Sequence, residues 1–222
     1  MLDIITVCVT PFQQNARILH CNDTNSTVIV DPGGDVPDIV NAIPKDTVIE
    51  AIWITHSHID HVSGVAELLS YIASHYPNQQ PPSVIAHPDD SINRDALPMQ
   101  SQMMQFPYSG DFNVTDTVKH QDTLTVGEYA FKVLHTPGHA IGHISLFCNT
   151  TNNTFKQPLL IAGDALFYQS IGRTDLPGGN HNQLLNSIRD HLFTLPSETV
   201  VCSGHGPNTT IAYEALHNPF LK

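Results

Sequence analysis

The stretch AIWITHSHIDH, residues 51–61, places three histidines and one aspartate within six positions, directly after an apolar run. The apolar residues predict a buried strand, so the polar residues fall where that strand ends. Imidazole and carboxylate groups are common ligands of zinc and similar divalent metals. A bare pair of histidines is weak evidence, but this density predicts a metal site that includes His56, His58, Asp60 and His61.

Three later segments repeat one design, a polar residue beside glycine at the end of a short apolar run. They are Thr136-Pro137-Gly138-His139, Gly163-Asp164 and Ser203-Gly204-His205-Gly206. Glycine permits a tight turn that presents the next side chain at a sheet edge. Each segment alone is typical of an ordinary turn. Together with the first cluster they supply seven candidate ligands from four strand ends, enough for two adjacent metal ions.

The composition is that of a compact globular protein. Hydrophobic residues make up 41% and charged residues 14% of the 222 positions, which favours a sizeable core. No low-complexity linker interrupts the chain, so we expect one domain, residues 1–222, built from two β-rich halves. Helices are expected at 64–76, at 182–195 and shortly before Asn218. We interpret 88–111 as a long loop with one helical turn at most.

The charge balance argues against polyanionic partners. The formal net charge is -12, from 21 acidic and 9 basic residues, and the basic residues are scattered. Binding to nucleic acid requires clustered Lys and Arg, so we expect none. No apolar stretch approaches the roughly 20 residues that span a bilayer, so no membrane association is expected either.

The N-terminal stretch and the cysteines favour a cytoplasmic protein. MLDIITVCVT carries no basic leader and predicts a first strand rather than a signal peptide. The four cysteines lack CxxC spacing, which favours reduced thiols over disulfides. The oligomeric state is not readable from the sequence.

The motifs THSHIDHVSG, TPGHAIGH, GDALF and SGHGP stand in the order and approximate spacing of the metallo-β-lactamase superfamily, which the chain resembles over nearly its whole length. The segments VDPGGD, ending at Asp35, and IGRTDLPGG, residues 171–179, are similar to the short bacterial glyoxalase II type of hydroxyacylglutathione hydrolase. The resemblance implies an α+β fold, a four-layer αββα sandwich of two β-sheets flanked by helices.

The resemblance also implies roles for individual residues. The first metal would be held by His56, His58 and His139, the second by Asp60, His61 and His205, with Asp164 bridging both. Asp60 would have a catalytic role, orienting a metal-bridging hydroxide. Arg173 would bind the substrate, and the alternative for this residue is a surface salt bridge with Asp175.

The implied reaction is thioester hydrolysis with a small-molecule substrate. S-D-lactoylglutathione would be hydrolysed to D-lactate and glutathione, a step of methylglyoxal detoxification, with two divalent metal ions per chain. Zinc is the first expectation, and iron or manganese would fit the same ligands. Longer glyoxalase II enzymes add a basic helical region after the last ligand. Here 213–217 contains no Lys or Arg, so other small thioesters are expected to be accepted as well.

Other activities stay open at this point. A persulfide dioxygenase on the same fold would use mononuclear iron held by His56, His139 and Asp164. A β-lactamase would normally carry a secretion signal and a Cys where Asp164 stands, and a nuclease is disfavoured by the acidic charge. A non-catalytic metal-binding or sensing protein is a further alternative, because fold does not imply function.

The remaining histidines have structural interpretations. We expect His143 to order its loop by hydrogen bonding and His135 to face the core. Asp31 is expected either to brace the metal loop or simply to form a turn. The others lack partners at useful spacing: His20, His75, His87, His120, His181, His191 and His217.

Overall fold

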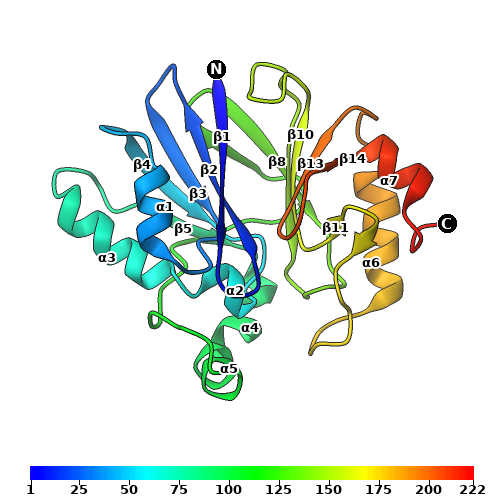
Figure 1. Ribbon diagram of the computed structural model, residues 1–222, viewed down its shortest axis with the longest axis horizontal. Coiled ribbons are helices and arrows are strands. Elements are labelled where there is room, and N and C mark those ends of the chain that lie inside the picture. The colour runs from blue at the N-terminus through cyan, green and yellow to red at the C-terminus, as the bar shows by residue number, and fades with distance from the viewer.

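Two six-stranded β-sheets pack face to face in the computed structural model, which describes residues 1–222, and helices cover both outer faces (Figure 1). The strand order is β1-β2-β3-β4-β5-β6 in one sheet and β14-β13-β10-β9-β8-β7 in the other. Each half of the chain therefore builds one sheet and its helical cover. This arrangement confirms the expected α+β sandwich of four layers.

The first sheet begins with an antiparallel meander and continues with parallel strands. Its strands are β1 (Leu2–Val9), β2 (Gln14–Cys21), β3 (Ser26–Val30), β4 (Val48–Trp53), β5 (Ser83–Ala86) and β6 (Asp116–Thr117). Helices α1 (Val36–Ala42) and α3 (Val65–His75) lie on its outer face, and the short α2 (Ile59–Val62) follows β4. The apolar positions Val65, Leu68 and Ile72 form the buried face of α3, as their helical spacing predicts.

The second sheet is mostly antiparallel, with one parallel pair between β10 and β13. Its strands are β7 (Thr123–Val126), β8 (Tyr129–His135), β9 (Ile144–Cys148), β10 (Leu159–Gly163), β13 (Val200–Ser203) and β14 (Thr209–Thr210). A two-stranded hairpin, β11 (Leu166–Phe167) and β12 (Ser170–Ile171), lies beside it. The outer face is covered by α6 (His181–Ser187), a π-helical turn η2 (Ile188–Leu192) and α7 (Ile211–His217).

The main hydrophobic core fills the space between the sheets. Trp53 of β4 and Phe131 of β8 meet there edge to face, with ring centroids 5.4 Å apart, and both are fully buried. Burying a side chain of this size stabilises the fold by roughly 1.5–3 kcal/mol. Because the core joins both sheets, it sets the positions of the loops at their ends.

The segment 88–111 differs from its prediction as a loop. It contains η1 (Pro88–Asp90), α4 (Ser91–Asp95) and α5 (Leu97–Met104), which lie together beside α2 (Figure 1). Pro88 and Pro98 occupy first-turn positions, where proline favours a helix, and buried Leu97 anchors α5. The polar and Met-rich composition carries no helical periodicity, which is why the sequence suggests a loop here. No helix is long and apolar enough to cross a membrane.

Candidate metal centre

The seven predicted ligands converge at one end of the sandwich, where strands of both sheets end. His56 and His58 follow β4, and Asp60 and His61 lie in the first turn of α2. The others follow β8, β10 and β13, so that the second sheet contributes His139, Asp164 and His205. Three sets of three ligand atoms each lie within 4.8 Å of one another: His56, His58 and His139; His56, His61 and Asp164; Asp60, His61 and His205.

The spacing of these atoms suits metal coordination. Tetrahedral ligands at about 2.0–2.1 Å from zinc lie about 3.3 Å from each other. His56 Nε2 and His139 Nε2 are 3.2 Å apart, and His205 Nε2 lies 3.2 Å from Asp60 Oδ2. We call His56, His58 and His139 the first group, and Asp60, His61 and His205 the second group. Asp164 lies between them, with Oδ1 3.3 Å from His61 Nε2 and Oδ2 3.6 Å from His139 Nε2. Its two carboxylate oxygens therefore face one candidate ligand from each group.

Hydrogen bonds occupy the Nδ1 atoms of the histidine ligands His139 and His205 and leave their Nε2 atoms available to bind a metal. His139 Nδ1–H donates to the Arg173 carbonyl at 2.7 Å, and His205 Nδ1–H donates to the Phe12 carbonyl at 3.0 Å. Metal-bound histidines are typically oriented by such bonds. His61 Nε2 and Asp164 Oδ1 are buried without a hydrogen-bond partner. Unpartnered buried polar atoms that face each other fit a site completed by cations.

Asp31 connects two of the histidines. Its carboxylate accepts a bond from His61 Nδ1–H at 3.0 Å, from the Thr55 backbone N–H at 2.7 Å and from the Thr55 hydroxyl at 2.6 Å. Since the Thr55 hydroxyl donates to Asp31, its oxygen accepts from His56 Nδ1–H at 3.1 Å. One buried carboxylate thus fixes the rings of both His56 and His61. Of the two roles expected for Asp31, it has the first, which is to brace the metal loop.

His143 is a structural neighbour of the centre, and its predicted ordering role is confirmed. It is completely buried, and its Nε2 accepts the Asp164 backbone N–H at 2.9 Å. Its Nδ1–H therefore donates to the Thr136 hydroxyl, 2.8 Å away. His143 holds the backbone that carries Asp164, and neither ring nitrogen is left to bind a metal.

Two glycines make room for the ligands. A Cβ atom at Gly33 would lie 1.6 Å from the Asp60 carbonyl oxygen. A Cβ atom at Gly204 would lie 2.2 Å from Asp164 Oδ1 and 2.9 Å from His61 Cε1. Gly204 is thus required for close approach to the ligands, whereas the sequence suggested only a turn. Gly138, unlike Gly33 and Gly204, adopts a left-handed backbone conformation, with φ of 127°, which glycine reaches more easily than other residues.

The two groups differ in electrostatics. Burial lowers the pKa of His56 well below its usual value and lowers that of His139, and burial together with His139 lowers the pKa of His58 to about 3. Burial also opposes charge on His61, but the carboxylates of Asp164 and Asp60 outweigh it and raise its pKa well above the ordinary value. The first group is therefore neutral and ready to coordinate, and the second binds protons in competition with metal.

Arg173 has a partner on the surface. Its guanidinium donates two bonds of 2.8 Å to the Asp175 carboxylate, and both side chains are exposed. This is the salt bridge that was the alternative interpretation, and substrate contact by Arg173 stays a prediction. Its backbone carbonyl has a second role, orienting His139, which side-chain motifs in the sequence do not reveal.

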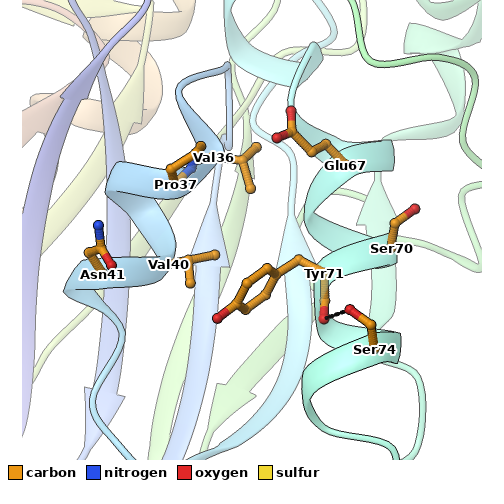
Figure 2. Close-up of a pocket in the computed structure, with 8 residues that line it drawn as sticks. All are labelled: Val36, Pro37, Val40, Asn41, Glu67, Ser70, Tyr71 and Ser74. Carbon is orange, nitrogen blue, oxygen red and sulfur yellow. Dashed lines mark hydrogen bonds between the residues drawn. The ribbon is translucent and has the colours of Figure 1, made fainter.

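A separate groove lies between α1 and α3 on the outer face of the first sheet. Figure 2 shows Val40, Tyr71 and Glu67 among the residues that line its volume of about 400 Å³. Glu67 is its only charged lining residue, so it offers no set of metal ligands. The candidate metal ligands lie instead in the segments that follow the strands.

Comparison with known proteins agrees with this geometry. The model of the metallo-beta-lactamase superfamily matches residues 9–205. Hydroxyacylglutathione hydrolase GloC of Haemophilus influenzae is 31% identical over 99% of this chain and 98% of its own. The structures of the BLEG-1 B3 metallo-beta-lactamase and of TTHA1623 in a di-iron-bound form both match with a TM-score of 0.82. Their identities are 35% and 29%, and each match covers at least 98% of both chains. The chain belongs to the metallo-beta-lactamase superfamily.

Proposed function

We propose that this protein is a binuclear metal-dependent thioester hydrolase that acts on hydroxyacylglutathiones such as S-D-lactoylglutathione. The observation that carries the proposal is the pair of complete three-residue ligand groups joined by Asp164. The similarity to the hydrolase of Haemophilus influenzae over nearly the full length of both chains supports the substrate class. We propose zinc as the metal; the di-iron-bound relative makes iron the alternative.

The chemistry follows from the donor set. Two divalent cations held here would supply positive charge that polarises a thioester carbonyl and lowers the pKa of a nearby water. Asp60 Oδ2 lies 3.2 Å from His205 Nε2, where the two atoms would share a cation, which leaves Oδ1 to hydrogen-bond and orient water at the site. Burial opposes the charged form of Asp60, but His61 and His205 outweigh it and lower the pKa of this carboxyl, so it is ionised at neutral pH.

The absence of a free proton donor among these residues favours a thiol leaving group. Every candidate ligand binds metal in its unprotonated form, and His143 is committed to Asp164 and Thr136. An alkyl thiol has a pKa of about 8–9, so a thiolate departs at neutral pH without an acid. An amine leaving group, as in a β-lactam, has to be protonated. A thioester therefore suits this site better than an amide.

β-Lactam hydrolysis is the second candidate, because the BLEG-1 B3 metallo-beta-lactamase is 35% identical and matches the fold with a TM-score of 0.82. A persulfide dioxygenase would need only His56, His139 and Asp164. The second group does not separate the two reactions, whereas the sequence LPGG at 176–179 favours the hydrolase.

The test is thiol release by the metal-loaded protein from S-D-lactoylglutathione. The same preparation is assayed for ring opening of a chromogenic β-lactam and for oxygen uptake with glutathione persulfide. Thiol release that is lost on chelation and restored by zinc supports the proposal. No thiol from any acyl-glutathione, together with activity in either other assay, assigns the protein to that reaction instead.

A further inference from the structure

The loop that carries His205 has little within it to fix its shape. This His205 loop, residues 203–208, joins β13 to β14 and has the sequence SGHGPN. Its two glycines allow many backbone conformations, and Gly206 adopts φ of 69°. Its proline has no backbone N–H to donate. Contacts from elsewhere in the chain therefore have to set the direction of the His205 ring.

Those contacts come from the hairpin of β1 and β2, which belongs to the other sheet. The Asn15 backbone N–H donates to the Gly204 carbonyl at 2.7 Å. The Asn15 side-chain amide donates to the Ser203 carbonyl at 3.1 Å and to the Gly206 carbonyl at 2.9 Å. Together with the bond of the His205 ring to the tip of this hairpin, these bonds tie the loop down at four consecutive residues.

Arg17, two residues further along β2, adds a buried cation to the same contact. It is 3% exposed, and its Nη2 donates to the Ser203 carbonyl at 2.9 Å and to Asn208 Oδ1 at 3.1 Å. Its Nη1 donates to the Thr6 hydroxyl, and its Nε is buried without a partner. None of the three acceptors carries a charge. The guanidinium is therefore removed from water without a bonded carboxylate to balance it.

The stability of the fold does not account for this arginine. Replacing a buried charge by an apolar side chain of similar size often leaves a protein equally stable or more stable. Without Arg17, the Ser203 carbonyl would keep its bond from Asn15. Thr6 and Asn208 are exposed, so both could bond to water instead. What Arg17 alone provides is a firm contact between β2 and both ends of the His205 loop.

We propose that Arg17 is a positioning residue of the metal centre, which together with Asn15 holds the His205 loop so that His205 and Asp60 face a shared cation. His205 Nε2 and Asp60 Oδ2 lie 3.2 Å apart, and a small shift of the loop would separate them. The first group has no member in this loop, so its ion should not depend on Arg17. The inference rests on the two-ion centre of the proposed function and not on the identity of the thioester.

The experiment is a zinc titration of full-length Arg17→Met against a competing chromophoric chelator. Met keeps a long side chain but removes the charge and its hydrogen bonds. We expect the dissociation constant of the second ion to rise by about 10–100-fold, the usual effect of losing a partner that orients a metal ligand. That of the first ion should not change. Arg189→Met removes an exposed arginine of η2 and is the matched control, which should bind both ions like the wild type.

Two further measurements separate positioning from a purely structural role. The urea midpoint of metal-free Arg17→Met should equal or exceed that of the wild type, because an unbalanced buried charge is gone. Cobalt(II) added to protein that already holds one zinc ion reports the second position by its visible absorption, which Arg17→Met should lower at equal cobalt. Asn208→Ala removes one acceptor of Arg17 at an exposed position and should weaken the second ion by a smaller factor.

A second ion held by Arg17→Met and by Asn208→Ala as tightly as by the wild type would overturn the proposal. Equal weakening of both ions in Arg17→Met, together with a lower urea midpoint, would also overturn it. Uptake of a single ion by the wild type would remove both this inference and the proposed function. Loss of the second ion in Arg17→Met, from a wild type that binds two ions but releases no thiol, would support the inference and reject the proposed function alone.

Discussion

His61 Nδ1 lies 3.0 Å from Asp31 Oδ2, in a pair that is almost completely shielded from solvent. The same carboxylate reaches His56 through the Thr55 hydroxyl. His56 belongs to the set with His58 and His139, and His61 to the set with Asp60 and His205, so Asp31 influences both sets without being one of the candidate ligands.

Asp31→Asn should therefore reduce metal affinity or activity by about 10–100-fold, the usual effect of removing a partner that orients metal ligands. The amide is similar in size but carries no charge, so His61 loses its anionic acceptor. Metal content after competition with a chelator measures the effect. Asp38→Asn, at an exposed position in α1, is the matched control. Equal metal retention in both variants would contradict this role for Asp31.

Asp60→Ala and His139→Ala remove one ligand from each group. Each should lower the rate of thioester hydrolysis by more than about 100-fold, which exceeds the loss seen when only an orienting partner is removed. Both variants are to be compared in kcat at matched zinc concentration, together with bound metal per chain. Near wild-type turnover in either would refute its assigned role.

Gly204→Ala tests the close approach of the last loop to the ligands. The added Cβ would meet Asp164 Oδ1 at 2.2 Å and His61 Cε1 at 2.9 Å, so these two side chains must move. We expect loss of the second metal ion and of activity. Gly206→Ala is the control, because its Cβ meets nothing within 4 Å, while its φ of 69° costs about 1–2 kcal/mol of strain. Loss of metal in the control alone would disprove the steric explanation.

Acidification should release the two metal ions in sequence. The raised pKa values of His61 and His205 mean that protons stay bound to these rings up to a higher pH, so protons compete with metal there first as the pH falls. His58, with a pKa lowered to about 3, meets no such competition between pH 7 and pH 5. Metal content after dialysis at decreasing pH should fall in two steps. His205→Ala should remove the step at higher pH.

The contact between Trp53 and Phe131 is expected to dominate the stability of the inter-sheet core. Phe131→Ala leaves a cavity and should lower the free energy of unfolding by about 3–5 kcal/mol. Phe220→Ala, at an exposed position near the C-terminus, should change it by less than about 0.5 kcal/mol. Urea denaturation of both variants in the metal-free state measures the difference. A change below 1 kcal/mol for Phe131→Ala would place the critical packing elsewhere.

The seven candidate ligands could be predicted from the sequence for a local reason, whereas the four-layer sandwich was predicted from the resemblance to a known family. The ligands stand in the segments that follow β4, β8, β10 and β13, and His139, Asp164 and His205 stand beside glycine, so the neighbouring residues mark their positions at a sheet edge. The helix at Val65–His75 is equally local, because its periodicity reflects a single buried face.

What escaped prediction depends on pairs that are distant in the chain. His135, which we expected in the core, is half-exposed, and its stacking on His87 arises only when the two sheets pack together. The close approach of Gly204 to Asp164 likewise joins residues 40 positions apart. In 88–111, buried Leu97 and two first-turn prolines stabilise short helices that carry no periodic signal. The pairing of Arg173 with Asp175 could be foreseen as one of two options, because only Thr174 separates them.

The division of each ligand group between the two sheets links metal supply to the lifetime of the protein. His56 and His58 need His139, and Asp60 and His61 need His205, so neither half of the chain holds an ion with a full set of donors. Bound metal would therefore stabilise the docked arrangement of the two halves, which the inter-sheet core already holds. By mass action, free metal at a hundred times its dissociation constant would add about 2.7 kcal/mol to the stability of the docked state. Without metal the folded chain would lose this increment, so it would open more often and be cleaved by proteases sooner.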